Sequence, residues 1–163
     1  MSISLGPVLT DALVDRLSGR DLDRHGALVI PLATIDPAGW PHVALFSYSE
    51  IVARDRGLLR LAIAGRSGSA ANLRRTGYAT VLLFDAGSVH YIKGTARERS
   101  PAMQCSPWNA VFDVSVTDVL ADASDPSREG ESFVSGGVTF KCDPSWAAGR
   151  TAVLAELLSD IRP

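Results

Sequence analysis

The sequence predicts a mainly β fold, an antiparallel β-barrel with flanking helices. Two observations predict it. About seven short apolar stretches alternate with tight-turn residues, and helical spacing of apolar residues is confined to the two ends and one short insertion. Closing the sheet would remove the unpaired edges that so many apolar strands otherwise expose. We therefore expect one domain over residues 1–163 with an N-terminal and a C-terminal helix.

The first predicted element is a short helix that begins near Pro7 and ends at Gly19, because the apolar residues between them recur at helical spacing. Residues 27–35 are apolar and rich in branched side chains, which predicts a strand. Pro31 lies inside this strand and cannot donate to a ladder, so it indicates a sheet edge or a bulge.

A hairpin follows, because Asp36-Pro37-Ala38-Gly39 has Asp, Pro and Gly at the turn positions that favour them. The returning strand is expected over residues 42–51. The remaining predicted strands span residues 58–64, 78–85, 89–97, 111–120 and 133–142, the last with a bulge at Gly136-Gly137. The final helix begins at Asp143-Pro144-Ser145 and carries an apolar stripe of Val153, Leu154, Leu157, Leu158 and Ile161.

Composition excludes several functional classes. The chain is 46% hydrophobic and 21% charged with a net charge of −2, so no basic surface indicates a nucleic-acid partner. No apolar run reaches the roughly 20 residues of a membrane span, and the N-terminus lacks the features of a signal peptide. We expect a cytoplasmic protein with a small-molecule substrate and no membrane partner.

Cysteines and histidines indicate neither a disulfide nor a metal site. Cys105 and Cys142 lie far apart without a CxxC motif, so free thiols are expected. The three histidines lack the close spacing of a zinc pair. We expect His42 at a strand edge and His90 in the barrel with its hydrogen bonds satisfied.

The stretch from Gly65 to Arg75 is the most informative part of the chain. Glycine and serine lie between an apolar strand and a short helix, which leaves backbone N–H groups and hydroxyls free at a helix N-terminus. With Arg66 beside them, these groups favour an anion, most often a phosphate. Ser67 or Ser69 either caps the helix or contacts the ligand, and Asn72 is either a polar helix residue or a further contact.

The order of these elements resembles the pyridoxamine 5′-phosphate oxidase-like family of FMN-binding split barrels. The segments that carry the resemblance are Asp36 to His42, Ser67 to Leu73, Thr80 to Phe84 and Lys93-Gly94-Thr95-Ala96. The resemblance implies a split β-barrel with antiparallel Greek-key strands, and a homodimer with two FMN sites at the subunit interface. It also implies F420 as a second possible cofactor, because related deazaflavin enzymes share the fold.

The resemblance assigns cofactor-binding roles residue by residue. The turn and helix start that match the phosphate-binding segment contain Arg66, Ser67, Ser69 and Asn72. The strand with Ala62, Ile63 and Ala64 is expected to run alongside the flavin, as is the strand over residues 44–48. Trp40 and Trp108 are expected to be packing residues, with Trp108 alternatively covering a flavin edge.

One departure from the family pattern lies in the turn itself. Many members carry Arg or Lys where this chain has Gly68 and Ser69. Charge-assisted hydrogen bonds are about twice as strong as neutral ones, so we expect FMN affinity to be weaker by about tenfold or more unless Arg66, Arg74 or Arg75 compensates. The substrate-binding residues of the true oxidase also lack a match.

Two functions stay open from the sequence. The first is a flavin-dependent oxidoreductase acting on an unidentified small molecule, which needs no assigned catalytic residue because the cofactor performs the redox chemistry. The second is a split-barrel dimer with a degenerate cofactor site that binds a ligand or serves a structural role without turnover.

Overall fold

The computed structural model describes residues 2–130, 133–141 and 143–160. The strands are β1 (Ser2–Gly6), β2 (Val29–Ile35), β3 (Pro41–Ser47), β4 (Ile51–Asp55), β5 (Leu58–Ala64), β6 (Tyr78–Asp85), β7 (Ser88–Ser100) and β8 (Asn109–Ala123). The helices are α1 (Asp11–Arg16), α2 (Leu22–His25), α3 (Gly68–Thr76), α4 (Pro126–Glu129), the 3₁₀ helix η1 (Pro144–Trp146) and α5 (Ala147–Leu158).

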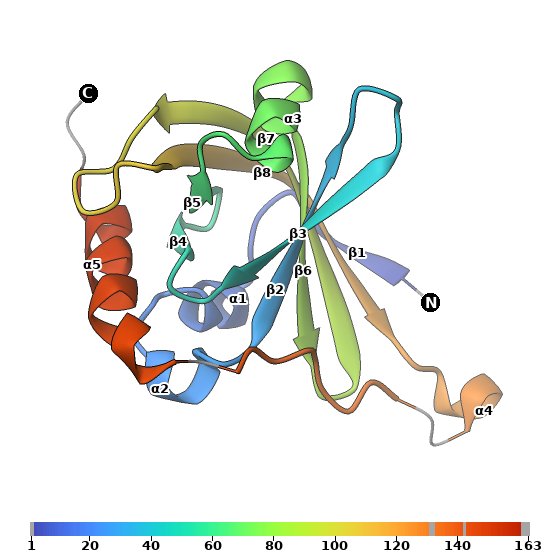
Figure 1. Ribbon diagram of the computed structural model, residues 1–163. Helices are drawn as coiled ribbons and strands as arrows, with labels where there is room; N and C mark the ends of the chain where they lie inside the picture. Colours follow the sequence, from blue (N-terminus) through green and yellow to red (C-terminus); the bar gives the residue numbers. More distant parts are fainter. Residues whose placement is uncertain (1, 131–132, 142, 161–163) are drawn as a thin grey trace.

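One antiparallel sheet of eight strands curls around the core, with helices around it (Figure 1). The strand order is β3-β2-β6-β7-β8-β5-β4, and β1 pairs with β8. β3 and β4 are the two ends of this order, so the described strands leave a seam between them where the barrel is not closed by hydrogen bonds. The split-barrel prediction is confirmed, whereas full closure of the sheet is wrong.

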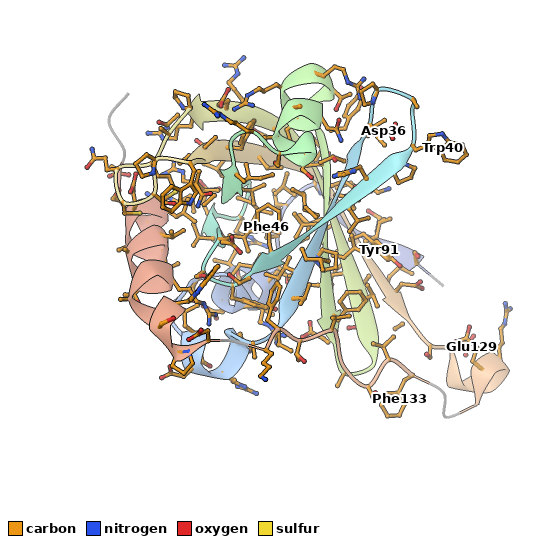
Figure 2. The ribbon with its side chains drawn as sticks, viewed as in Figure 1. Asp36, Trp40, Phe46, Tyr91, Glu129 and Phe133 are labelled. Carbon is orange, nitrogen blue, oxygen red and sulfur yellow. The ribbon has the colours of Figure 1, made fainter. Side chains whose placement is uncertain are left out.

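The β2–β3 hairpin supports one side of this seam. Its turn forms as the sequence predicts, because Asp36 Oδ1 accepts hydrogen bonds from the N–H groups of Ala38 at 2.9 Å and Trp40 at 2.8 Å. Figure 2 shows Trp40 at the tip of the hairpin and Phe46 pointing into the interior. Phe46 is buried in the barrel core, whereas the Trp40 side chain is 69% exposed, so its predicted packing role is wrong.

The single strand predicted over residues 42–51 is divided by a turn. The Glu50 carboxylate accepts hydrogen bonds from the Ser47 N–H at 2.8 Å and from the Ser47 hydroxyl at 2.9 Å. These bonds end β3 and allow the chain to cross from one edge of the sheet to the other. The pocket described below lies beside this turn.

Three other sequence predictions need correction. Pro31 lies in an interior strand, since β2 pairs with β3 and β6, although its pairs with β6 are limited to Leu32 and Ala33. The described part of residues 133–142 forms no strand and makes only the isolated bridge from Thr139 to Leu28. The predicted N-terminal helix is shorter than expected, since α1 covers only Asp11–Arg16, and the sequence did not indicate β1 before it or α2 after Gly19.

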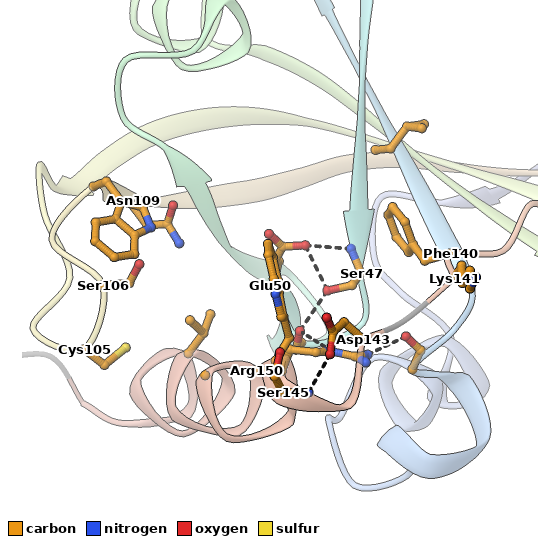
Figure 3. Close-up of a pocket in the computed structure, with 17 residues that line it drawn as sticks. Ser47, Glu50, Cys105, Ser106, Asn109, Phe140, Lys141, Asp143, Ser145 and Arg150 are labelled. Atoms are coloured by element: carbon orange, nitrogen blue, oxygen red, sulfur yellow. Dashed lines mark hydrogen bonds between the residues drawn. The ribbon is translucent and has the colours of Figure 1, made fainter.

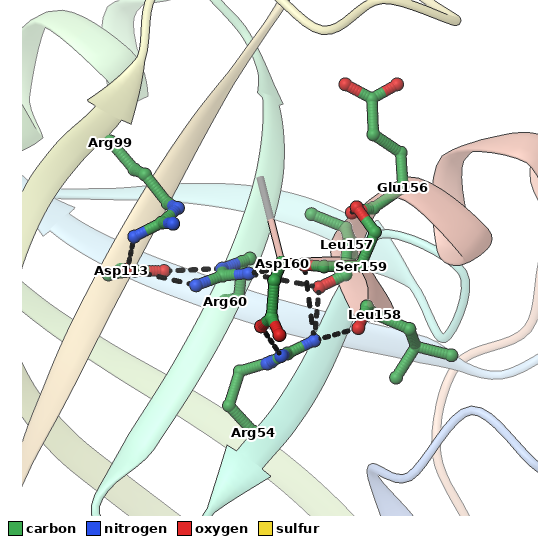
Figure 4. Close-up of polar contacts among 9 residues, drawn as sticks. All are labelled: Arg54, Arg60, Arg99, Asp113, Glu156, Leu157, Leu158, Ser159 and Asp160. Carbon is green, nitrogen blue, oxygen red and sulfur yellow. Dashed lines mark hydrogen bonds and ion pairs between the residues drawn. The ribbon is translucent and has the colours of Figure 1, made fainter. Parts of the chain in front are cut away.

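Helix α5 closes the outside of β4 and β5. Its side chains Leu154 and Leu157 are buried, as predicted, while Leu158 is exposed and Ile161 lies outside the described residues. Two strand arginines hold its C-terminal carbonyls (Figure 4). Arg60 donates to Leu157 O at 3.4 Å and Ser159 O at 3.1 Å, and Arg54 donates to the same turn. These cations lie at the negative end of the helix dipole, where they stabilise it.

None of the helices in the described residues combines the length and the apolar character needed to cross a lipid bilayer.

Candidate functional site

The predicted strand–turn–helix forms at the end of β5. Ser67 is the N-cap of α3, with extended backbone angles, and its Oγ accepts a hydrogen bond from Ala70 N at 3.1 Å. The Gly65 N–H donates to Trp108 O at 2.8 Å, which ties the turn to the loop between β7 and β8. Of the two alternatives left open for Ser67, the structure therefore shows the capping role.

The first turn of α3 presents unused donors. Among the described residues, the N–H groups of Gly68 and Ser69 have no hydrogen-bond acceptor, as expected for the first amides of a helix. Ser69 is 2% exposed, and its hydroxyl has no partner there either. Arg66 is exposed, and its guanidinium makes no ion pair with a described residue. These groups are the chemical components of an anion site.

His42 lies against this turn, which the sequence did not predict. A Cβ placed on Gly68 would lie 3.6 Å from both Cε1 and Nε2 of the His42 ring. The imidazole therefore occupies the space beside the helix start and brings a ring N–H that can donate to an anion. It reaches this position because His42 pairs with Thr34 in the β2–β3 ladder, on the face that points toward α3.

The other polar residues of the helix are committed to the fold. Arg74 donates to Glu98 at 2.9 and 2.5 Å and to Gly65 O at 2.7 Å, so it braces the turn from behind. The hydrogen bond to Glu98 raises the pKa of Arg74, and the same bond lowers the pKa of Glu98. Arg75 donates to Ile35 O at 2.5 Å. Neither arginine is placed to replace the cations missing at positions 68 and 69.

Asn72 and the end of β5 contact the interior. The Asn72 Nδ2 donates to Thr34 Oγ1 at 3.0 Å, in a position that is 4% exposed. Ala62 and Ile63 are buried at 0% and 5% exposure, while Ala64 is exposed. The side chains of Ala62 and Ile63 pack within the protein, and the backbone of this strand pairs with β8. Cofactor contact by these residues stays a prediction.

A cavity of about 810 Å³ opens beside the turn between β3 and β4 (Figure 3). It is bounded by the end of β3, the β7–β8 loop and α5. Side chains from all three segments line it, among them Ser47, Glu50, Ser106, Asn109, Trp146 and Arg150. Trp108 also lines this cavity and is 75% exposed, so its predicted packing role is wrong. The cavity adjoins the β5–α3 turn at Trp108, whose carbonyl accepts the hydrogen bond from the Gly65 N–H.

Two interactions position the walls of the cavity. Arg150 of α5 donates to Ser49 Oγ at 3.5 Å and to Gly26 O. The Glu156 carboxylate accepts from the N–H groups of Gln104 at 2.8 Å and Cys105 at 2.9 Å, which fixes the β7–β8 loop against α5. Partial desolvation of the Cys105 thiol, and then its hydrogen bond to Glu156, raise the pKa of Cys105 to about 11, so the thiol is not a nucleophile near neutrality.

A polar cluster surrounds Tyr48, which lies in the turn between β3 and β4. Arg16 donates to the Tyr48 hydroxyl at 2.9 Å and pairs with Asp85 at 2.9 Å, and the His25 ring stacks on Tyr48 at 5.2 Å. Burial lowers the pKa of His25, and the Arg16 charge lowers it further. His90 Nδ1 is buried with no hydrogen-bond partner, 3.6 Å from Asp85, so the prediction of a satisfied barrel histidine is wrong for this atom.

Within the described residues, no three His, Cys, Asp or Glu side chains gather in a way that would hold a metal ion.

Similar sequences are few. No known family profile matches the chain. An uncharacterized Bacillus subtilis protein, YclD, is 30% identical to it over 99 residues. That match covers 61% of this chain and 58% of YclD, so the chain spans under two thirds of the relative's length.

Similar structures are more numerous and agree on the fold. A Lactobacillus delbrueckii protein provisionally named pyridoxamine 5′-phosphate oxidase superposes with a TM-score of 0.56 at 17% identity, over 71% of this chain and 97% of that one. The HupZ protein of Group A Streptococcus superposes with a TM-score of 0.53 at 14% identity, over 68% and 92% of the two chains. At these identities the likeness establishes the architecture.

Proposed function

Because the chain has the split-barrel fold of the pyridoxamine 5′-phosphate oxidase-like proteins, we propose that it binds FMN and acts as a flavin-dependent oxidoreductase on a small molecule. One observation carries the proposal: the α3 start combines two free N–H groups, the Ser69 hydroxyl and the unpaired Arg66 guanidinium in one turn. This set fits a phosphate group, with His42 as a fifth donor beside Gly68.

The remaining parts of the cofactor would follow the seam of the barrel. The ribityl chain and ring would lie along β3, with the exposed residue Ala64 of β5 on the opposite side. A bound flavin supplies the exchange of electrons or a hydride with the substrate, and the protein contributes binding and orientation. F420 would use the same phosphate-binding turn.

We also propose that the protein is a homodimer. The outward face of β2, β3 and β6 carries apolar side chains, and the ladder places Val43 beside Ala33 and Leu45 beside Pro31. Val43 and Leu45 are 54% and 56% exposed. An apolar sheet face of this kind favours a second copy of the chain. Leu45→Arg is expected to give a monomer in light scattering, and an unchanged mass would place the interface elsewhere.

A non-catalytic binding protein is the second candidate. It is favoured by the neutral residues at positions 68 and 69, and by the commitment of Arg74 and Arg75 to Glu98 and Ile35. A degenerate cofactor site would retain weak phosphate binding but lack two cations that contact the phosphate.

Calorimetric titration with FMN and with riboflavin tests the phosphate site. Riboflavin is the same ring and chain without the phosphate, so FMN should bind at least about tenfold more tightly if the turn holds the phosphate. Arg66→Gln should reduce FMN affinity several-fold and leave riboflavin affinity unchanged. Arg20→Gln, a change at another exposed arginine, is the matched control. A protein that binds neither FMN nor F420 would contradict the proposal.

A further inference from the structure

The cavity beside the β3–β4 turn contains polar groups that form no hydrogen bond with the described residues. Ser106 is only 6% exposed, and its hydroxyl forms no hydrogen bond with any described residue. The Asn109 side-chain amide, half-buried on the same wall, has no partner among them either. Both groups face the cavity and keep hydrogen-bonding capacity that the described residues do not use, so they are available to a ligand.

Glu50 adds an acceptor from another wall of the cavity. Its Oε2 accepts both hydrogen bonds from Ser47, and its Oε1 has no partner among the described residues. Figure 3 shows Glu50 and Ser47 between Asn109 and Ser106 on one side and Phe140 and Lys141 on the other. A carboxylate oxygen accepts hydrogen bonds and cannot donate, whereas a hydroxyl and an amide N–H₂ can donate. The set is complementary to a ligand edge with an N–H next to a carbonyl.

The apolar part of the cavity is aromatic and unusually exposed. Trp108 and Trp146 line it from separate segments and are 75% and 70% exposed. Indole faces left in solvent at a cavity mouth favour the stacking of a flat conjugated ring. The lining charges Glu50 and Asp143 are balanced by Lys141 and Arg150, so the cavity favours a ligand without net charge.

We propose that this cavity is a binding site for a flat, uncharged heterocycle with a lactam or imide edge, stacked on the two indoles and hydrogen-bonded by Glu50, Ser106 and Asn109. The ring N–H donates to Glu50 Oε1, and the neighbouring carbonyl accepts from Ser106 and Asn109. The inference goes beyond the flavin proposal and does not depend on it, because none of these residues belongs to the phosphate-binding turn.

Nuclear magnetic resonance of the three tryptophans tests the site on the intact protein. The chain has three indole N–H groups, and Trp40 at the hairpin tip serves as an internal control. Titration with xanthine, which has the required N–H and carbonyl edge, should shift the Trp108 and Trp146 signals and leave that of Trp40 unmoved. Caffeine, the same ring with methyl groups on three of its nitrogens, should bind at least about tenfold more weakly, since Glu50 Oε1 loses its N–H partner and a methyl group takes the place of that hydrogen.

Variants test the recognition of the ligand edge. Glu50→Gln should weaken xanthine about tenfold, and Ser106→Ala several-fold, whereas Glu129→Gln at an exposed position should have no effect. Thermal unfolding of each variant checks that the fold is retained. Equal binding of xanthine and caffeine, shifts at Trp40 alone, or no shift at all would overturn the proposal.

A further set of binding measurements distinguishes this site from the flavin site. Arg66→Gln should leave xanthine affinity unchanged, whatever it does to FMN. Displacement of xanthine by riboflavin would assign the cavity to the flavin ring and overturn a separate site, while absence of FMN binding would contradict only the proposed function.

Discussion

Asp113→Ala should destabilise the protein far more than the loss of a surface ion pair would. Asp113 accepts from Arg60 through two hydrogen bonds, Nε–Oδ1 at 2.7 Å and Nη2–Oδ2 at 3.3 Å. The Arg60 side chain is 5% exposed, so the substitution leaves a buried guanidinium without a counter-charge. Removing one partner of a buried pair costs about 3–5 kcal/mol, and we expect the lower end because Arg60 keeps carbonyl acceptors on α5.

Urea unfolding measures this loss. With a denaturant slope of about 2 kcal/mol per molar, a loss of about 3 kcal/mol lowers the unfolding midpoint by about 1.5 M. The double variant Arg60→Met with Asp113→Leu removes both charges together and should recover to within about 1 kcal/mol of the wild type. Asp15→Ala, which breaks the exposed pair with Arg20, should cost less than about 0.5 kcal/mol.

Comparing the unfolding free energies of the single and double variants tests whether the buried charge causes the loss of stability. If Asp113→Ala costs no more than Asp15→Ala, the buried charge is not what the carboxylate stabilises. If the double variant is as unstable as the single one, the loss comes from packing between β5, β8 and α5 and not from an uncompensated charge.

Three further outcomes are expected. The folded protein holds the pKa of His25 below its ordinary value, so the unfolded chain binds the proton more readily; the urea midpoint should therefore fall as the pH decreases below about 6.5, and His25→Phe should reduce this dependence. Gly68→Arg should tighten FMN binding about tenfold without affecting riboflavin, because it adds a charge-assisted hydrogen bond at a position where a Cβ makes only ordinary contact with His42. Glu156→Gln, in a Cys142→Ser background, should lower the pKa of Cys105 from about 11 and raise its alkylation rate at pH 8.5 by at least about tenfold; an unchanged rate would show that Glu156 has no influence on the thiol.

The turn at the start of α3 could be predicted because its determinants are local. Ser67 caps α3 by accepting a hydrogen bond from Ala70, three residues along the chain, and no distant contact is needed to form it. The same holds for the Asp36 turn, in which one carboxylate oxygen accepts two nearby amides. The β2–β3 hairpin followed from this turn.

The approach of His42 to Gly68 could not be predicted from either residue alone. It depends on the register of the β2–β3 ladder and on the way α3 crosses the end of the sheet, which are both non-local. The cavity could not be predicted from the sequence for the same reason, since Glu50, Asn109 and Arg150 come from three separate segments. The one local signal was the pair of serines before Glu50, which interrupt the apolar pattern of the strand.

The strand predicted over residues 133–142 shows the limit of alternating hydrophobicity. The segment is extended and its backbone does bond to the barrel, with Gly87 N donating to Val134 O and Val29 N to Val138 O. These bonds do not extend into a ladder, and the segment makes only the isolated bridge from Thr139 to Leu28. A strand pattern therefore indicates an extended backbone and does not by itself decide whether a ladder forms.

Helix α5 is attached to the barrel unevenly along its length. Its buried leucines and the carbonyls held by Arg54 and Arg60 all lie toward its C-terminal end, whereas Ala147, Ala148 and Gly149 are exposed. The two ends of α5 are therefore held by different means: buried leucines and the bonds from Arg54 and Arg60 hold one end, and the Arg150 side chain, which also lines the cavity, holds the other. Substitution of Arg150 would thus loosen the end of α5 beside the cavity and leave the end packed on β4 and β5 in place.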